Sequence, residues 1–281
     1  MPGGSLGGSA LRDLAARHGI RPSKALGQNF LTDPNLARAI VSDAGVRPGD
    51  RVVEVGAGLG SLTRALAEAG AEVVAVEADR AIIPALRESV GELPAVRVVH
   101  ADALRIDWAA ALPGGPWRMV SNLPYNVAVP VLFRMLDGAP QVTDYLVMVQ
   151  REVGQRLAAE PGSEAYGAAS ARLAYLADVA MVRRVPASVF WPAPSVESVL
   201  VRITPRRPPV AAPREALFRV IEAGFAQRRK TMRNALVRLG LGPADAEAAL
   251  RGCGLDPNVR AEELGLEAFD CLARAAGGRD G

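Results

Sequence analysis

The sequence predicts an α/β protein with a Rossmann-like sheet, helices on both of its faces, and a small all-helical region at the C-terminal end. Apolar, strand-like runs alternate with helical patterns, a glycine turn directly follows one of the first runs, and strand signals stop near residue 205. At 281 residues the chain is long enough for one large domain and one small domain. We expect a flexible tail and short helix over 1–20, the sheet domain over 21–205 and the helical domain over 206–281.

The overall composition is that of a globular protein, with 49% hydrophobic and 22% charged residues and a mean hydropathy of +0.13. No apolar run approaches the length of a membrane span, and the start lacks a signal-peptide pattern, so we expect a cytoplasmic protein without membrane attachment. Cys253 and Cys271 are too few for a disulfide framework and lack metal-ligand spacing. With His18 and His100 as the only histidines, we expect no metal site.

The elements follow one another in the order that this fold requires. The expected strands lie at 51–55, 72–76, 96–100, 117–120, 144–149, 179–185 and 196–203. Expected helices lie at 11–18, after Asp33-Pro34, at 61–69, after Asp79-Arg80, at 129–136, 151–159 and 165–177, and then at 215–226, 230–239, 243–251 and 262–275. The stretch 24–31 shows neither period and is interpreted either as a linker or as a lid over a ligand.

The first of these strands runs directly into a glycine turn. Gly56, Gly58 and Gly60 follow Arg51–Val55, and Ser61 begins the next helix. Glycines at such a turn let the backbone approach a ligand closely. The spacing is G-x-G-x-G, which differs from the G-x-G-x-x-G of dinucleotide-binding proteins and suits a ligand without a pyrophosphate.

Acidic residues stand at the ends of the next two strands. Glu77 lies 19 residues after Gly58, where a carboxylate can bind the two hydroxyls of a ribose. Asp102 follows the third strand and can accept a hydrogen bond from the exocyclic amine of an adenine. Each acid alone is also a good N-cap. Together, beside the glycine turn, they predict a ligand crevice.

The fourth strand leads into Ser121-Asn122-Leu123-Pro124-Tyr125-Asn126. The Asn122 amide oxygen can accept from an exocyclic N–H, and Pro124, with its fixed φ, can hold the Leu123 carbonyl outward as a second acceptor. Tyr125 offers a ring for stacking. The loop is interpreted as a holder for a flat, amine-bearing base. The alternative is an ordinary turn after a strand.

A proline-stiffened loop, 185–194, carries the adjacent aromatic residues Phe190 and Trp191. Phe190 is expected to reach the base pocket opposite Tyr125. The alternative is a structural turn whose aromatic side chains fill the core.

Positive charge is concentrated after the sheet domain. Residues 206–238 contain nine Arg or Lys residues and two Glu residues, while the whole chain has a formal net charge of +3. Such a segment predicts a polyanionic partner, or else a solvated helix face. Within it, Arg228, Arg229, Lys230 and Arg233 are the residues expected to contact the polyanion, which the family resemblance described next implies is RNA.

From about Lys24 onward the chain resembles the ribosomal RNA adenine dimethyltransferase family. The resemblance rests on Gly27–Leu31, Glu54–Gly60, Val76–Asp79, Asp102-Ala103, Asn122–Asn126, Val185-Pro186 through Phe190 to Ser198, and Phe225–Thr231. Two departures from the family pattern, Ala57 for a frequent proline and Ala128 for a common serine, leave the site residues intact. The linker and last helices match loosely.

The resemblance implies an S-adenosylmethionine-dependent methyltransferase that dimethylates N6 of two adjacent adenines in the hairpin loop near the 3′ end of small-subunit (16S) rRNA. Its partner would be the immature small ribosomal subunit, and we expect a monomer. The resemblance implies cofactor contacts from Asn29, Leu31, Gly56, Gly58, Glu77, Asp102 and Asn122. It implies that Asn122, Leu123, Tyr125 and Phe190 hold the target base.

Three alternatives remain open. The related macrolide-resistance branch methylates an adenine of large-subunit rRNA, and the basic stretch Gln227–Thr231 with Arg233-Asn234 favours the small-subunit branch instead. A non-catalytic ribosome-assembly factor would not need Gly56, Glu77, Asp102 and Asn122 intact. An NAD-dependent enzyme is disfavoured by the glycine spacing.

Overall fold

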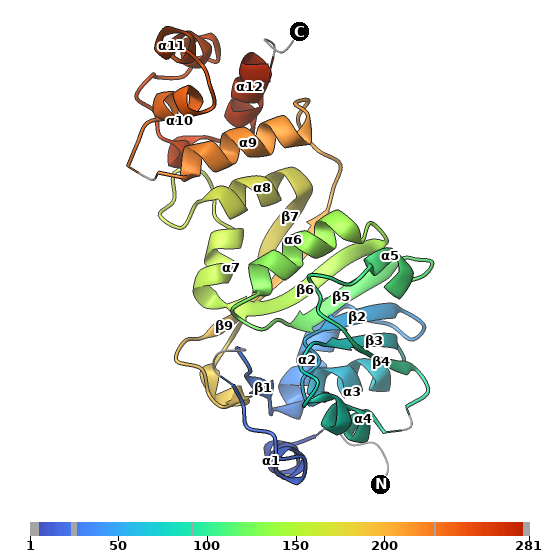
Figure 1. Ribbon diagram of the computed structural model, residues 1–281. Helices are drawn as coiled ribbons and strands as arrows, with labels where there is room; N and C mark the ends of the chain where they lie inside the picture. Colours follow the sequence, from blue (N-terminus) through green and yellow to red (C-terminus); the bar gives the residue numbers. More distant parts are fainter. Residues whose placement is uncertain (1–5, 24–26, 92, 228, 278–281) are drawn as a thin grey trace. The chain divides into compact units, whose positions relative to one another are not determined.

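The computed structural model describes residues 6–23, 27–91, 93–227 and 229–277. Its contacts divide the chain into two compact units. The first, here called the cavity unit, comprises 1–154 and 180–205, and the second, the helical unit, comprises 155–179 and 206–281. Figure 1 shows the sheet and the helices that make up these units.

A seven-stranded sheet in the order β4-β3-β2-β5-β6-β9-β7 organises the cavity unit. Its strands are β2 (Arg51–Val55), β3 (Glu72–Glu77), β4 (Val96–His100), β5 (Trp117–Asn122), β6 (Val142–Gln150), β7 (Ala177–Val185) and β9 (Ser198–Pro205). Neighbours from β4 to β6 are parallel, and β9 runs antiparallel to β6. All seven expected strands are confirmed, with boundaries that shift by a few residues.

Consecutive residues of the central strands are buried, as in Val52–Val55 and Val73–Glu77. Successive side chains of a strand point to opposite faces, so both faces of the sheet are covered. The helices here are α1 (Gly8–Arg17), α2 (Pro34–Ala44), α3 (Ser61–Glu68), α4 (Ile83–Val90), α5 (Trp108–Ala111), α6 (Ala128–Gly138) and the start of α7 (Arg151–Leu157). Asp33 caps α2 by accepting from the N–H groups of Asn35 and Leu36, as the Asp-Pro sequence predicts.

A separate two-stranded sheet joins distant parts of the cavity unit. β1 (Phe30–Leu31) pairs antiparallel with β8 (Phe190–Trp191), which follows the 3₁₀-helix η1 (Ala187–Val189). Thr32 adds two hydrogen bonds to the Val189 carbonyl, from its backbone N–H and from its hydroxyl, both at 2.8 Å. Of the irregular stretch 24–31, Phe30 and Leu31 thus pair with a segment far along the chain, and residues 24–26 lie outside the described residues.

The helical unit contains α8 (Ala168–Leu176), α9 (Arg214–Phe225), α10 (Met232–Arg238), α11 (Pro243–Gly252), the 3₁₀-helix η2 (Ala261–Glu263) and α12 (Leu266–Gly277). Its buried cluster unites residues of α8 with residues of the C-terminal helices, such as Tyr175 with Phe218 and Phe269. This packing explains a difference from the expected boundary at 205, because residues 155–179 share the core of the C-terminal helices.

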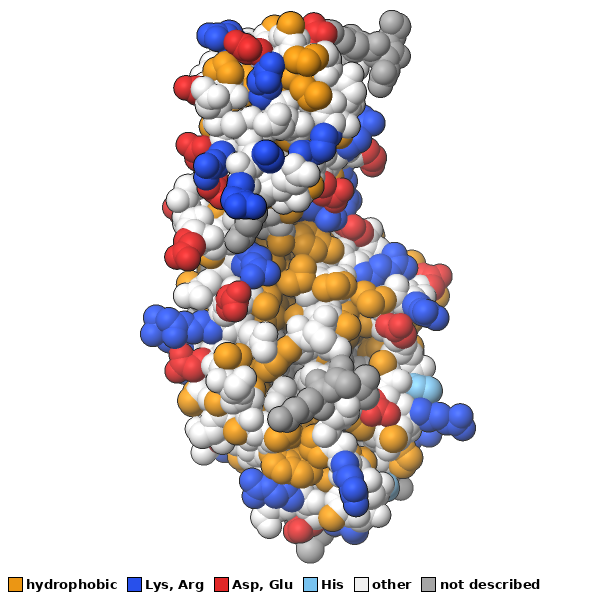
Figure 2. Space-filling model, turned by 60° about the vertical axis from the view of Figure 1, so that its left-hand side comes forward, with side chains coloured by type: hydrophobic (Ala, Val, Ile, Leu, Met, Phe, Trp, Pro, Cys, Tyr) orange, Lys and Arg blue, Asp and Glu red, His pale blue; other side chains and the backbone are white. Residues whose placement is uncertain are grey.

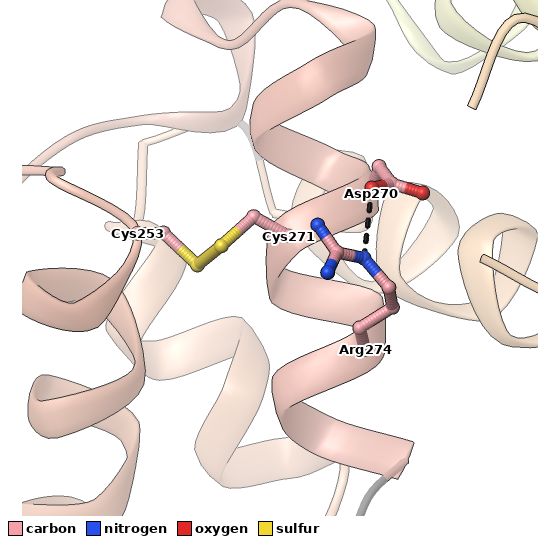
Figure 3. The surroundings of a disulfide bond; sticks show 4 residues. All are labelled: Cys253, Asp270, Cys271 and Arg274. Atoms are coloured by element: carbon pink, nitrogen blue, oxygen red, sulfur yellow. Dashed lines mark hydrogen bonds and ion pairs between the residues drawn. A yellow bond between two sulfur atoms is a disulfide. The ribbon is translucent and has the colours of Figure 1, made fainter. Parts of the chain in front are cut away.

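The two cysteines form a disulfide between Cys253, at the end of α11, and Cys271 of α12 (Figure 3). The sequence analysis expected no disulfide framework; the structure contains this single bridge. In the preceding residue of α12, Asp270 accepts from the Ala212 N–H at 2.6 Å and from Arg274 Nε, within the same helix, at 2.9 Å. The bridge attaches α12 to the end of α11, and the Asp270–Ala212 hydrogen bond attaches it to the segment before α9.

None of the helices in the described ranges is both long enough and apolar enough to span a bilayer.

Candidate active site

A cavity of about 480 Å³ lies at the carboxyl ends of the parallel strands. It occurs where the strand order reverses, between β2 and β5, which is the usual ligand position in open α/β sheets. All the expected cofactor residues line it: Asn29, Leu31, Gly56, Gly58, Glu77, Asp102 and Asn122. Leu123 and Tyr125 line it as well.

The glycine turn is shaped both by its backbone and by its neighbours. Gly56 and Gly58 have φ values of +76° and +55°, which residues other than glycine rarely adopt. A Cβ on Gly56 would lie 2.9 Å from the Pro124 Cδ atom, and one on Gly58 would lie 3.0 Å from the Phe30 ring. The turn thus packs against the Asn122 loop on one side and β1 on the other.

Glu77, at the end of β3, lies beside this turn. Its two carboxylate oxygens accept from the N–H groups of Gly58 and Asp79, each at 2.9 Å. Burial raises the pKa of Glu77, while these backbone donors favour the charged form. Each oxygen still has a second lone pair, so the carboxylate can also accept from ligand hydroxyls.

Asp102 caps no helix, and its side chain is held in a turn at the cavity. One of its oxygens accepts from the Leu104 N–H at 2.9 Å, as in an Asx turn. The side chain is 49% exposed, lines the cavity, and lies 3.6 Å from the Arg105 Nε atom. The turn fixes the carboxylate without removing it from the cavity.

The Asn122 amide is oriented by Asn29, the residue before β1. Its Nδ2 atom donates to the Asn29 carbonyl at 3.1 Å, and this contact requires the NH₂ group to face that carbonyl. Oδ1 is thereby the acceptor on the other side of the amide. Asn29 itself donates from Nδ2 to the Gly27 carbonyl at 3.2 Å. The residue expected to hold the target base is therefore positioned by the segment expected to cover the cofactor.

Phe190 does not reach the cavity. Its side chain is 4% exposed and belongs to the core cluster of α2, α3 and the sheet. Its backbone pairs with Leu31 in the two-stranded sheet. Phe190 is not among the residues that line the cavity in this structure, and its stacking on the target base opposite Tyr125 stays a prediction. Trp191 packs instead against Phe30, with 6.0 Å between ring centroids.

Several residues of the site escaped the sequence analysis. Gln28 donates from Nε2 to Asp79 at 2.8 Å and ties the segment before β1 to the end of β3. Ser198 hydrogen-bonds the Tyr125 hydroxyl at 2.6 Å. Gln28 and Ser198 both lie within stretches that carry the family resemblance, but no role was expected for either side chain.

A second buried acid lies beneath the glycine turn. Glu54 is 1% exposed and lines the cavity, and the Thr63 hydroxyl hydrogen-bonds its carboxyl group. Burial raises the pKa of Glu54 to about 8, so the group is mainly protonated at neutral pH.

The expected RNA-binding residues lie in the helical unit, before and within α10. Arg229 and Lys230 are exposed and form no ion pair within the described residues, whereas Arg233 Nε lies 3.8 Å from Glu247. Arg228 lies outside the described residues. In Figure 2, basic and acidic side chains alternate over the upper part of the face that is drawn.

The sheet is Rossmann-like, with a glycine turn after β2, acidic residues after β3 and β4, and an asparagine loop after β5. This arrangement is typical of methyltransferases whose cofactor contains a nucleoside. The family model described as Ribosomal RNA adenine dimethylase matches residues 20–272. The chain belongs to this family, as the resemblance implied. Membership also confirms S-adenosylmethionine as its cofactor, and the cavity residues fit that molecule.

Individual relatives agree with this assignment. The ribosomal RNA small subunit methyltransferase A of Thermobifida fusca is 51% identical over 270 residues, covering 94% of this chain and 93% of that protein. The crystal structure of the 23S rRNA methyltransferase ErmE is 25% identical with a TM-score of 0.68, covering 88% of this chain and 99% of that one. A dimethyladenosine transferase from Plasmodium falciparum shares the fold, with 20% identity, a TM-score of 0.71, and coverage of 86% and 95%.

Proposed function

We propose that this enzyme transfers two methyl groups to N6 of each of two adjacent adenines in the 3′-terminal hairpin loop of small-subunit rRNA during ribosome biogenesis. The observation that carries the proposal is the Asn122 amide, turned by its 3.1 Å hydrogen bond to the Asn29 carbonyl inside the cavity. The 51% identity to a small subunit methyltransferase A supports this substrate over large-subunit rRNA. The immature small subunit is the proposed partner, and the proposed active form is a monomer.

The proposed cofactor contacts follow from the cavity. Glu77 binds the ribose hydroxyls, Asp102 accepts from the adenine amine, and the Gly56–Gly58 turn lies along the methionine part. Asn29 and Leu31 of the segment around β1 cover the bound molecule. When bound, S-adenosylmethionine supplies an electrophilic methyl carbon.

The adenine amino group needs alignment because its lone pair is delocalised into the ring. Asn122 Oδ1 and the Leu123 carbonyl accept the two N6 hydrogens and direct the lone pair toward the methyl carbon. Positive charge develops on N6 during the transfer, and the same oxygens stabilise it. The N6 proton then passes to water, because an N-alkylated adeninium is acidic. The mechanism requires no histidine or carboxylate base.

The target base must leave its stack, which costs a few kcal/mol and less in a loop than in a duplex. The Tyr125 ring returns about 1–3 kcal/mol by stacking on the extruded base. Arg229 and Lys230, with Arg228 and Arg233, contact phosphates and orient the RNA without reading its sequence.

The test is to incubate the protein with unmethylated small subunits, unmethylated large subunits and a cofactor with an isotopically labelled methyl group, and then map the label. Label on N6 of two adjacent adenines in the small-subunit 3′ hairpin supports the proposal. Label confined to large-subunit rRNA would establish the alternative branch. Cofactor binding without any transfer would favour an assembly factor.

A further inference from the structure

Ser198 is a buried polar residue that the mechanism above does not use. Its side chain is fully buried at the start of β9, among Val199, Leu200 and Val201. A buried hydroxyl without a hydrogen-bond partner is costly, and Ser198 finds its partner in the Tyr125 hydroxyl, 2.6 Å away. This contact joins a cavity-lining residue to a strand that begins 73 positions later.

The sheet holds Ser198 in place. Ser198 pairs with Gln150 across β9 and β6, and Asn122 pairs with Met148 across β5 and β6. Three hydrogen-bonded strands thus set the position of the serine relative to the Asn122 loop. A loop residue attached to such a serine acquires a defined position, although loops are generally more mobile than strands.

The Tyr125 residue lines the cavity, and its hydroxyl is hydrogen-bonded to Ser198. Burial raises the pKa of the Tyr125 hydroxyl, which therefore remains neutral and able to donate at physiological pH. With its outer end hydrogen-bonded, the ring is restrained from rotating out of the wall. A stacking surface that is fixed before the base arrives avoids the entropy cost of ordering it afterwards.

We propose that Ser198 is a positioning residue that holds the Tyr125 ring in the orientation needed to stack on the extruded adenine. This role rests on the proposed function, and it acts through Tyr125 without contact between Ser198 and substrate. Loss of either hydroxyl leaves the ring present but less well oriented.

A double-mutant cycle with Ser198→Ala and Tyr125→Phe tests the role. Because both changes remove the same hydrogen bond, each should lower kcat on small subunits by roughly 10-fold, and the double variant should be no slower than either one. Cofactor affinity should change less than about twofold, since the cofactor side of the cavity is untouched. Additive losses, or unchanged kcat in Ser198→Ala, would overturn the proposal.

Ser170→Ala is the matched control. Ser170 is 2% exposed in α8, donates to the Arg156 carbonyl and accepts from the Gly167 N–H. The Ser170→Ala variant should have a lower thermal stability, because it also loses the hydrogen bonds of a buried serine. Its kcat should remain near that of the wild type. A rate loss in Ser170→Ala as large as in Ser198→Ala would show that stability alone explains the effect.

A second measurement does not depend on methyl transfer. With 3-fluorotyrosine at position 125, the fluorine resonance of Ser198→Ala should narrow and move toward that of free fluorotyrosine, because the ring gains mobility. An unchanged resonance would overturn the positioning role even in an active enzyme. A protein that shows the resonance change but transfers no methyl group would instead contradict the proposed function alone.

Discussion

The polar residues of the cavity unit and those of the helical unit are held in opposite ways. Glu77 and Asn122 line the cavity with backbone hydrogen bonds that set the direction of each group. Arg229 and Lys230 are exposed, and no ion pair fixes them among the described residues. The first arrangement depends on geometry and the second on charge.

This difference determines how each region responds to substitution. A cavity residue acts through a hydrogen bond of defined direction and length. Its substitution should therefore cause a large loss in one step only, either cofactor binding or methyl transfer. A solvent-exposed cation acts through Coulomb attraction, so its loss is modest, additive with its neighbours and dependent on salt. Three variants test the contrast, and a fourth tests the buried acid Glu54 beneath the glycine turn.

Asn122→Ala should have the largest effect. It removes the acceptor proposed to align N6, so kcat should fall by about 10²-fold or more, while the cofactor dissociation constant rises less than about 10-fold. Single-turnover methylation and calorimetric cofactor binding measure the two quantities. Asn35→Ala, an exposed asparagine at the start of α2, is the control and should keep full activity. An Asn122→Ala enzyme with near-normal kcat would refute the alignment role.

Glu77→Gln should come next. The substitution replaces a carboxylate that accepts from Gly58 and Asp79 and is proposed to bind the ribose, so cofactor affinity should fall by roughly 10- to 100-fold. At saturating cofactor, kcat should change little. Glu72→Gln, at the exposed opposite end of β3, is the matched control. Equal affinities of the two variants would remove Glu77 from the cofactor site.

Replacement of both Arg229 and Lys230 by alanine should give a smaller effect that depends on ionic strength. If each contacts a phosphate, the slope of log K against log salt for rRNA binding should become shallower by about 1.5–2. Cofactor affinity should stay constant. The control removes Arg251 and Arg260, which pair with Glu247 and Glu262. A slope that changes equally in both double variants would point to net charge alone.

Glu54→Gln should change stability more than catalysis. The pKa of Glu54 is about 8 in the fold and 4.5 in its ordinary state, so wild-type stability falls as pH rises between these values. Glutamine cannot ionise and can still accept from Thr63. The variant should equal the wild type near pH 5 and exceed it by roughly 1–3 kcal/mol at pH 9.

Urea unfolding across this pH range measures the difference. The raised pKa of Glu77 contributes in the same direction, so some pH dependence should persist in Glu54→Gln. A wild-type stability that rises from pH 5 to pH 9 would contradict the assigned protonation of Glu54.

The cavity was largely predictable because its residues follow consecutive strands whose carboxyl ends meet at one edge of a parallel sheet. Gly56, Glu77, Asp102 and Asn122 needed only that rule and the strand signals. Their exact hydrogen bonds were not predictable, since Asn122 is turned by the backbone carbonyl of Asn29, just before β1, and not by a side chain.

The parts that escaped prediction depend on contacts between distant segments. The pairing of Phe190 with Leu31 was not predicted, because the two-residue strands β1 and β8 are too short for a periodic signal. Arg233 looked equivalent to Arg229, and its proximity to Glu247 appears only once α10 and α11 are placed side by side. Residues 155–179 read as part of the sheet domain until the shared core with α9 and α12 is known.

The pairing of β1 with β8 has a consequence for synthesis of the chain. Thr32 binds the Val189 carbonyl, a partner 157 positions later, so most of the polypeptide must leave the ribosome before the segment around β1 can settle. A nascent chain that already contains the glycine turn and the Asn122 loop still lacks β8, the strand with which β1 pairs. If Asn29 and Leu31 cover the methyl donor as proposed, we expect its retention to be a late event in the maturation of this enzyme.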